Sequence, residues 1–409
     1  MSYTYTDKIK FAYTTNFDAF GRLRTSAPLT LFDSSHRYRD NGLWATLTAG
    51  SGAKTFNTNQ GVIDMNVTNA SGDKVVRETY RVFAYQPGKS LLALNTFTFA
   101  TGQSGLRQRV GYFGENNGFY LELAGTTLSI VKRSSVSGSI DNNSIAKSSW
   151  NVDPMDGTGP SGITLDITKS QIFWIDLEWL GVGSVRCGFV INGEFYTCHV
   201  FNHANLITST YITTACLPLR YEIENTSGTS SSNTLTQICS SVMSEGGYEL
   251  RGEERSIDTG ILTPYTLLVA GTFYPLASIR LKSGNLDSIV IPSYIDLLPK
   301  DNANYSWKIF VGGTTSGGSW TTLDANSSVN YNITGSSFSS GTCVRTGFFS
   351  ASNQGKLNIN IGDDLFKNQL LRDGLTSTPL EFTICVAAET VGGSGNKIWT
   401  SINWEEVTK

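Results

Sequence analysis

The sequence predicts an all-β protein with two domains, and three observations support this fold class. The chain has 409 residues, which is too long for one ordinary domain. Only 16% of the residues are charged, 41 are glycine, and Ser, Thr and Asn are abundant, whereas long-helix proteins are rich in Ala, Glu, Lys and Leu. Short segments of alternating apolar and polar residues are separated by turn-rich runs, which is typical of strands joined by tight turns.

Changes in patterning divide the chain into four parts. Residues 1–28 are predicted to be an extended arm, because their apolar residues show no lasting period and Pro28 closes the stretch. Residues 29–250 are predicted to form one large β-sandwich. Residues 251–260 mix glycine with charge and lack a period, which is typical of a linker. Residues 261–409 resume the alternation and are predicted to form a smaller C-terminal β-sandwich.

Alternation with a period of two predicts the individual strands. In the large domain the predicted strands are 75–85, 90–99, 107–113, 118–123, 127–133, 171–180, 185–191 and 194–201. In the smaller domain they are 262–269, 276–281, 288–291, 306–311, 357–361, 380–387 and 397–404. One helix is also predicted, capped by Asp363, running to Leu370 and stopped by Gly374.

The segment 172–180 is the most informative predicted strand. One face is apolar and must point into a core, and its residues are Phe173, Ile175, Leu177 and Trp179. The other face is aromatic and acidic, and its residues are Trp174, Asp176 and Glu178. An indole ring can stack on the C–H face of a sugar while carboxylates accept its hydroxyls, so these three are candidate carbohydrate-binding residues. The alternative is a strand face that contacts solvent or another subunit.

The next two predicted strands form a hairpin around Asn192-Gly193, a strong two-residue turn signal. The hairpin repeats the two-sided pattern, which indicates two sheets packed as a sandwich. A domain of about 220 residues suits a jelly roll better than an immunoglobulin fold of about 100 residues. Folding about this turn places Cys187 opposite Cys198, within reach of a disulfide. Two reduced cysteines packed in the sheet are the favoured interpretation, and a disulfide is the alternative.

Charge and composition exclude several classes of function. The net charge is −3, so no overall positive field attracts nucleic acid. No stretch reaches the ~18 apolar residues of a membrane span, and the N-terminus lacks the apolar segment of a secretory signal, so synthesis in a cytoplasm is expected. His36, His199 and His203 stand apart from any metal-ligating cluster. No metal, cofactor or catalytic residue is therefore expected.

The strand at 172–180 and its hairpin resemble the concanavalin-like jelly roll, which includes lectins and family-16 glycosidases. Those glycosidases carry Glu-x-Asp-x-(x)-Glu on such a strand, and the resemblance implies the same place for a sugar site. Here Trp174 occupies the leading position, so only Asp176 and Glu178 match the pattern. Because one of the two catalytic carboxylates is missing, the chain is not expected to be an enzyme.

Other segments resemble a family of structural proteins from tailed bacteriophages, best represented among cyanophages. They are Phe17–Ser26, Leu31–Ser34, Tyr85–Lys89, Arg109–Phe113, Met155–Gly162, Trp179–Gly183 and Leu217–Glu222. The resemblance implies a component of the virion: a capsid decoration, neck, baseplate or fibre protein. It also implies that the partners are other virion proteins and copies of the chain itself, assembled as a symmetric homo-oligomer. It assigns no functional residues.

The arm carries six aromatic residues that it cannot bury by itself, and they are Tyr3, Tyr5, Phe11, Tyr13, Phe17 and Phe20. Our hypothesis is that these residues dock onto a neighbouring subunit or onto another virion protein. The expected function is therefore structural, exerted through contacts between subunits. The alternative is a lectin-like module that binds glycans of the host, and a glycoside hydrolase is a third and weaker hypothesis.

Overall fold

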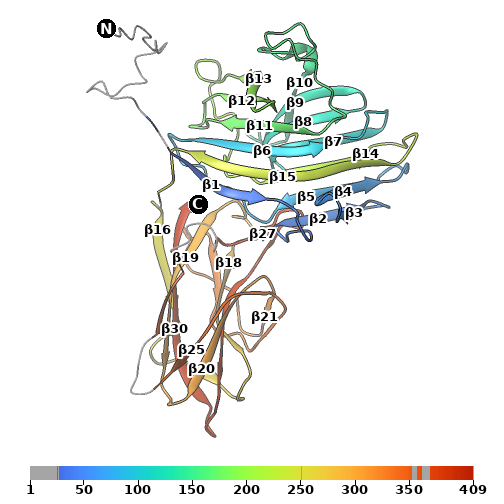
Figure 1. The fold of residues 1–409 in the computed structure, drawn as a ribbon. Helices are drawn as coiled ribbons and strands as arrows, with labels where there is room; N and C mark the ends of the chain where they lie inside the picture. Colours follow the sequence, from blue (N-terminus) through green and yellow to red (C-terminus); the bar gives the residue numbers. More distant parts are fainter. Residues whose placement is uncertain (1–24, 26, 250, 352–356, 362–368, 409) are drawn as a thin grey trace, which may run out of the picture.

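The computed structural model describes residues 25, 27–249, 251–351, 357–361 and 369–408, and within them the protein is all-β. The chain builds two β-sandwiches, one from the N-terminal half and one from the C-terminal half, joined end to end (Figure 1). The only helical element among these residues is the short 3-10 helix η2 (Lys147–Ser149). The predicted fold class is therefore confirmed. The six aromatic residues of the predicted arm lie outside the described residues.

The first sandwich packs an eight-stranded antiparallel sheet against a seven-stranded one. In the first sheet the order is β13 (Glu194–Phe201), β12 (Val185–Ile191), β11 (Gln171–Leu177), β6 (Ser90–Thr98), β15 (Asn233–Glu245), β4 (Val62–Val67) and β3 (Ala53–Asn57), with β1 (Pro28–Ser34) also paired to β15. In the second the order is β10 (Asp141–Ala146), β9 (Thr127–Ser134), β8 (Gly118–Ala124), β7 (Leu106–Phe113), β14 (Leu219–Asn225), β5 (Lys74–Thr79) and β2 (Trp44–Ala49). This stacking of two large antiparallel sheets is the large β-sandwich predicted for residues 29–250.

The second sandwich has a five-stranded and a six-stranded sheet. The first contains β16 (Glu253–Asp258), β30 (Asn396–Thr408), β19 (Ile289–Pro299) and β26 (Leu357–Asn360) in that order, with β17 (Tyr265–Leu267) also paired to β30. The second has the order β22 (Thr321–Thr322), β23 (Val329–Asn332), β18 (Tyr274–Leu281), β29 (Phe382–Ala388), β20 (Asn304–Val311) and β25 (Thr342–Ser350). Two short hairpins complete it: β21 (Thr314–Ser316) with β24 (Ser337–Ser339), and β27 (Arg372–Asp373) with β28 (Thr378–Pro379).

One sequence prediction for this half is changed by the structure, and a second lies mostly outside the described residues. The predicted linker 251–260 contains β16, which pairs with β30 along its whole length. Its charges, which suggested a linker, belong to an edge strand whose alternate side chains face solvent. Of the predicted helix, residues 362–368 lie outside the described residues, and its predicted stop, Gly374, lies in the turn between β27 and β28.

Each sandwich has its own apolar core. In the first, large aromatic side chains from both sheets meet with less than 2% exposure, among them Phe97, Phe173 and Phe189 from one sheet and Tyr112, Phe119 and Tyr221 from the other. The period-two alternation places these rings inward, since every second residue of a strand faces the core. In the second, Ile279, Leu297, Ile309 and Trp404 lie in a separate core cluster.

The segment around β27 ties the second sandwich to the first. Arg372 is buried and forms an ion pair with Glu78 of β5. The backbone N–H of Arg372 donates to the carbonyl of Tyr80 at 3.1 Å. Nearby, the Gln369 side chain donates to the carbonyl of Val82 at 3.1 Å. Because a buried ion pair requires its partners to stay together, these contacts fix the end of one sandwich against the other.

Cys187 and Cys198 lie in one hairpin but are not opposite each other. The register pairs Cys187 with His199 and Gly188 with Thr197, so Cys198 is the extra residue of a β-bulge. The expectation that the two cysteines face each other is therefore wrong, because the bulge shifts the pairing by one residue. Both are free thiols, as are the other four cysteines of the chain.

We expect a thiol titration of the folded protein under nondenaturing conditions to detect two reactive cysteines, Cys239 and Cys343, which are exposed. The other four are buried, and burial raises the pKa of the Cys187 thiol, which disfavours the reactive thiolate. Unfolding should raise the count to six. A count of four in the denatured, unreduced protein would show that one disulfide exists and would contradict the structure.

Candidate binding site at the junction of the two sandwiches

The predicted carbohydrate-binding residues do not form one open surface. Trp174 and Asp176 lie on the outward face of β11, as predicted, but they are only 4% and 6% exposed. The Phe195 ring packs on Trp174 with ring centroids 5.6 Å apart, and Arg186 of β12 forms an ion pair with Asp176. Glu178 lies beyond the end of β11, where its exposed carboxylate accepts a hydrogen bond from the backbone N–H of Ser184 at 3.2 Å.

This face nevertheless retains unused polar atoms. Trp174 Nε1 and Asp176 Oδ1 are buried, and neither has a hydrogen-bond partner among the described residues. Burial raises the pKa of Asp176, and the Arg186 guanidinium only partly opposes this effect. Unsatisfied buried groups are costly, so a ligand or water that reached them would be stabilised. Reaching them requires movement of Phe195 or Arg186.

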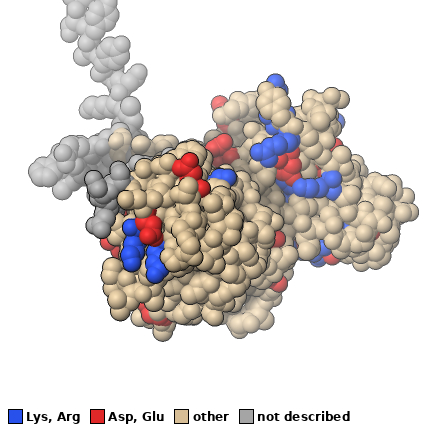
Figure 2. Space-filling model, turned by 90° about the horizontal axis from the view of Figure 1, so that it is seen from below, with Lys and Arg blue, Asp and Glu red and all other residues tan. Residues whose placement is uncertain are grey.

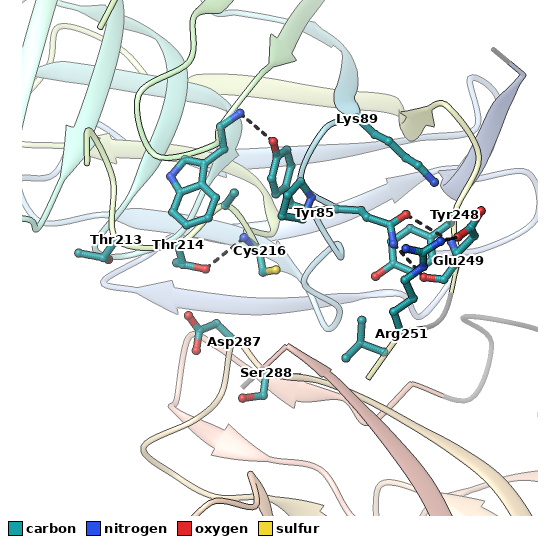
Figure 3. Close-up of a pocket in the computed structure, with 15 residues that line it drawn as sticks. Tyr85, Lys89, Thr213, Thr214, Cys216, Tyr248, Glu249, Arg251, Asp287 and Ser288 are labelled. Atoms are coloured by element: carbon teal, nitrogen blue, oxygen red, sulfur yellow. Dashed lines mark hydrogen bonds and ion pairs between the residues drawn. The ribbon is translucent and has the colours of Figure 1, made fainter. Parts of the chain in front are cut away.

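An open pocket of about 810 Å³ lies where the two sandwiches meet (Figure 3). One side is built by the first sandwich, which contributes Tyr85, Trp179 and the segment 213–216. The segment 248–251 adds Tyr248, Glu249 and Arg251, and the second sandwich supplies Asp287 and Ser288 from the opposite side (Figure 3). Its volume lies within the range of about 300–1,000 Å³ typical of small-molecule sites, which often form between domains.

Local contacts hold the two central rings of the pocket in place. The Tyr85 hydroxyl accepts hydrogen bonds from the backbone N–H groups of Trp179 and Leu180, both at 3.2 Å. The two rings meet edge to face with centroids 5.8 Å apart. The indole Nε1 of Trp179 donates to the carbonyl of Ile212 at 3.4 Å. Leu180 has a positive φ of 40°, so the chain turns sharply after β11, and Trp179 lines the pocket instead of continuing the strand.

The pocket also presents groups that can bind a polar ligand. No hydrogen bond or ion pair joins the Asp287 carboxylate or the Lys89 ammonium to another described residue, and Asp287 is exposed. Glu249 and Arg251 form an exposed ion pair at the rim. Burial raises the pKa of Tyr248, which keeps its phenol protonated at neutral pH. Fixed rings beside charged hydrogen-bonding groups can hold a flat-faced polar molecule such as a sugar.

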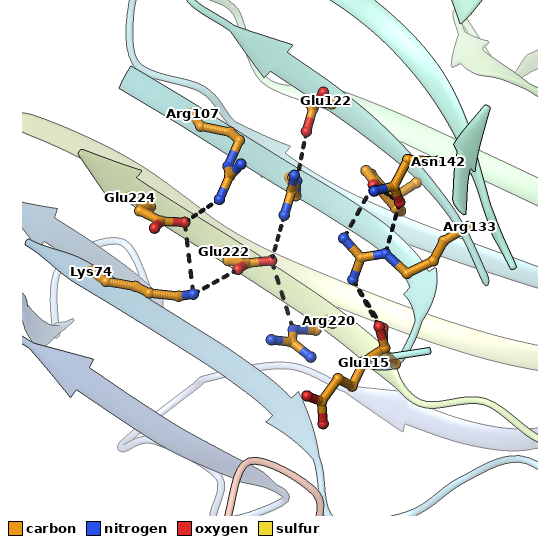
Figure 4. Close-up of polar contacts among 12 residues, drawn as sticks. Lys74, Arg107, Glu115, Glu122, Arg133, Asn142, Arg220, Glu222 and Glu224 are labelled. Atoms are coloured by element: carbon orange, nitrogen blue, oxygen red, sulfur yellow. Dashed lines mark hydrogen bonds and ion pairs between the residues drawn. The ribbon is translucent and has the colours of Figure 1, made fainter. Parts of the chain in front are cut away.

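A second polar region covers the outer face of the seven-stranded sheet (Figure 4). Its centre is Glu222 of β14, which is 3% exposed and lies between Lys74, Arg109 and Arg220. Burial alone would raise the pKa of Glu222, but these three cations outweigh burial and lower it to about 2. A carboxyl that stays ionised cannot donate a proton, so Glu222 is unsuited to act as a general acid.

Charges are sparse on most of the surface. Seen from the side of the second sandwich, most of the surface is uncharged, and basic and acidic side chains lie together in small mixed groups, both on the near part of the molecule and on the part behind it (Figure 2). Among the described residues, His, Cys, Asp and Glu side chains nowhere gather in a group of three able to hold a metal ion. None of the helices in this part of the chain is long and apolar enough to cross a membrane.

Sequence reasoning missed the pocket residues, although a signal was present. Two segments that carry the resemblance to phage proteins, Tyr85–Lys89 and Trp179–Gly183, contribute residues to its wall. Trp179 was assigned to the core face of a longer strand. The pocket combines segments from six separate parts of the chain, so no local motif could define it.

The comparisons with known proteins give structural neighbours only. The sequence matches no known protein family and no curated protein. A β-glucanase of Bacillus licheniformis aligns with 53% of this chain and 98% of its own, at 11% identity and a TM-score of 0.34. The exoplasmic/lumenal domain of VIP36 aligns with 55% of this chain and 95% of its own, at 12% identity and a TM-score of 0.33. A carbohydrate esterase of the Shiga toxin-encoding bacteriophage phi24B aligns with 54% of this chain and 100% of its own, at 10% identity and a TM-score of 0.30. At such values these likenesses carry no function over to this chain.

Proposed function

We propose that this protein is a glycan-binding module without enzymatic activity and that the junction pocket is its binding site. The observation that carries the proposal is that one open cavity combines fixed aromatic rings, Tyr85 and Trp179, with the charged groups of Asp287 and Lys89, for which the described residues provide no partner. The Trp179 ring, which is only partly buried, offers a stacking surface for the apolar face of a sugar, and the buried Tyr85 holds this ring in place. The carboxylate and ammonium accept and donate hydrogen bonds to its hydroxyls, and such charge-assisted bonds are the strong ones.

The carboxylates argue for binding without hydrolysis. A glycosidase needs one carboxyl that is protonated at working pH and a second, ionised one beside the same bond. The ion pair with Arg186 holds Asp176, the bond from Ser184 holds Glu178, and Glu222 has a pKa of about 2. Release of reducing sugar by the protein, lost in Glu178→Gln, would support the glycosidase hypothesis instead.

We expect the full chain to bind a subset of glycans on an array, and we expect Asp287→Ala to weaken that binding at least tenfold. The loss of a charged hydrogen bond costs about 1.5–3 kcal/mol, and 1.4 kcal/mol corresponds to a factor of ten in affinity. Asp141→Ala is the matched control, because Asp141 is also an exposed carboxylate but lies on β10 outside the pocket.

Two other results on the same array would change the proposed site or the proposed function. Binding that survives Asp287→Ala and disappears in Trp174→Ala would move the site to the outward face of β11, where Trp174 Nε1 and Asp176 Oδ1 are buried without a partner in the described part of the chain. Failure to bind any glycan would overturn the proposed function.

We also propose that the chain is a structural component of a tailed-phage particle. The resemblance along roughly residues 17–225 supports this role, and the low content of charged residues, 16%, suits lasting contacts between subunits. The two proposals are compatible, since an attachment protein of a virion can bind host glycans. A reconstruction of the particle that shows this chain, its position and its copy number is the direct test.

A further inference from the structure

The outermost strand of the six-stranded sheet is open to pairing. β25 pairs with β20 along one edge, and among the described residues no strand pairs with its other edge. It is nine residues long and carries two exposed apolar side chains, Val344 at 44% and Phe348 at 83% exposure. A long edge strand with exposed apolar residues offers a row of unpaired N–H and C=O groups, to which a further strand can add.

A shallow apolar groove of about 740 Å³ runs beside this edge on the outer face of the sheet. The register opposes Lys308 to Thr346 and Ser306 to Phe348, so all four lie on this outer face. Phe273 closes the groove, with the Lys308 ammonium 4.3 Å from its ring centroid. The lining combines the rings of Phe273 and Phe348 with small residues such as Ser306 and Ala387.

The N-terminal segment has the pattern of a strand that fits such an edge. From residue 3 to residue 17 the odd positions are apolar except for Asp7 and Thr15, and they are Tyr3, Tyr5, Ile9, Phe11, Tyr13 and Phe17. The even positions between them are polar except for Ala12. This period of two corrects our expectation that the segment has no lasting period, and it is typical of a strand with one apolar face.

We propose that residues 3–17 of one copy of the chain add as a strand to β25 of a neighbouring copy. The aromatic face of the added strand continues the outer face of the six-stranded sheet and packs beside Phe348. Backbone hydrogen bonds to β25 supply affinity, and the alternate rings in the groove supply specificity. The 24 residues that precede Thr25 can extend by about 3.3 Å each, or up to ~80 Å, which is long enough to reach another molecule.

The contact joins different surfaces of successive copies. The segment leads into β1 of the first sandwich, whereas β25 belongs to the second (Figure 1). Such a head-to-tail contact is heterologous, and it generates closed rings or open filaments of subunits. This proposal does not depend on glycan binding, and its test leaves the junction pocket unchanged.

The exposed thiol of Cys343 on β25 allows the pairing to be trapped in the full chain. Single cysteines are introduced at Asp7, Ile9 and Thr15, odd positions that in the proposed pairing share the outer face with Cys343, which the register opposes to Phe310. The background carries Cys239→Ser, which removes the other exposed thiol. After mild oxidation, at least one position should give covalent dimers and larger species on a non-reducing gel. The same position should give none when Cys343→Ser is added. Ser137→Cys, an exposed position in the first sandwich, is the control that should not crosslink.

A second variant tests the edge itself. Val344→Lys combined with Phe348→Lys should reduce the yield of crosslinked dimer at least tenfold, because edge lysines oppose strand addition. Both side chains are exposed, so the circular dichroism spectrum should be unchanged. The proposal is overturned if no arm position crosslinks, if dimers persist with Cys343→Ser, or if the crosslinks form only within single chains.

Discussion

Replacing Arg77 with methionine is expected to lower the free energy of unfolding of the first sandwich by about 3–5 kcal/mol, the range for removing one partner of a buried ion pair. Arg77 is fully buried, on the core face of β5. Its guanidinium donates to both carboxylate oxygens of Asp40 at 2.8 and 2.9 Å, and to Thr46 Oγ1 at 2.9 Å. Its Nε donates to Gln237 Oε1 of β15 at 2.7 Å. Methionine fills the space but removes the donor to Gln237 Oε1 and Thr46 Oγ1 and leaves Asp40 paired with Lys54.

Equilibrium unfolding in urea measures this loss. Arg251→Met is the matched control, because Arg251 forms an ion pair with Glu249 at the surface, where its side chain is 75% exposed. Exposed pairs contribute roughly 0–1 kcal/mol, so the control should unfold close to the wild type. If Arg77→Met costs no more than Arg251→Met, the buried network does not stabilise the sandwich as we infer.

Glu222 should make the free energy of unfolding decrease at acidic pH. Its pKa falls from an ordinary value of 4.5 to about 2 in the folded state, because the attraction of Arg220, Arg109 and Lys74 exceeds the effect of burial. The unfolded state therefore binds a proton first as the pH falls. The stabilisation is fully present above pH 4.5 and is lost as the pH falls through about 2. It amounts to about 3 kcal/mol.

The measurement is the free energy of unfolding from pH 7 to pH 2 in the wild type and in Glu222→Gln. The variant should be less stable at pH 7 by a similar amount and should lose less stability on acidification. Glu224→Gln is the control, since Glu224 is on the same face of β14 but its side chain is 21% exposed. Parallel pH profiles of the wild type and Glu222→Gln would contradict the role assigned to Glu222.

Strands with clear alternation could be predicted from the sequence. The hairpin strands Val185–Ile191 and Glu194–Phe201 have the bounds that the sequence predicts, because the Asn192-Gly193 turn and the apolar alternation define both. The β-bulge beside Cys187 could not be predicted. A bulge depends on how the hairpin packs against the rest of the sandwich, and no residue type within the hairpin indicates where the extra residue lies.

Two central strands escaped sequence analysis for physical reasons. β14 alternates buried Leu219, Tyr221 and Ile223 with charged residues, and the charges are tolerated there because cations of neighbouring strands neutralise them. β15 buries polar groups such as Gln237, which receives the hydrogen bond of Arg77 from the opposite sheet. In both strands, the residues that neutralise the charges or bond the buried polar groups are far away in sequence.

The candidate site also depends on contacts between residues that are far apart in the sequence. Alternation correctly assigned Trp174 to the outward face of β11, but only the positions of Phe195 and Arg186 show that this face is covered. The junction pocket depends on the docking of one sandwich on the other through Arg372 and Glu78. Periodicity describes single strands and cannot predict how two domains meet.

The most direct test of the account is the structure of the protein bound to the oligosaccharide that it prefers on the array. We predict that the sugar lies in the junction pocket, with a ring stacked on Trp179 and a hydroxyl bound by Asp287. A sugar found on the outward face of β11 beside Trp174, or on the charged face around Glu222, would contradict the assignment of the site.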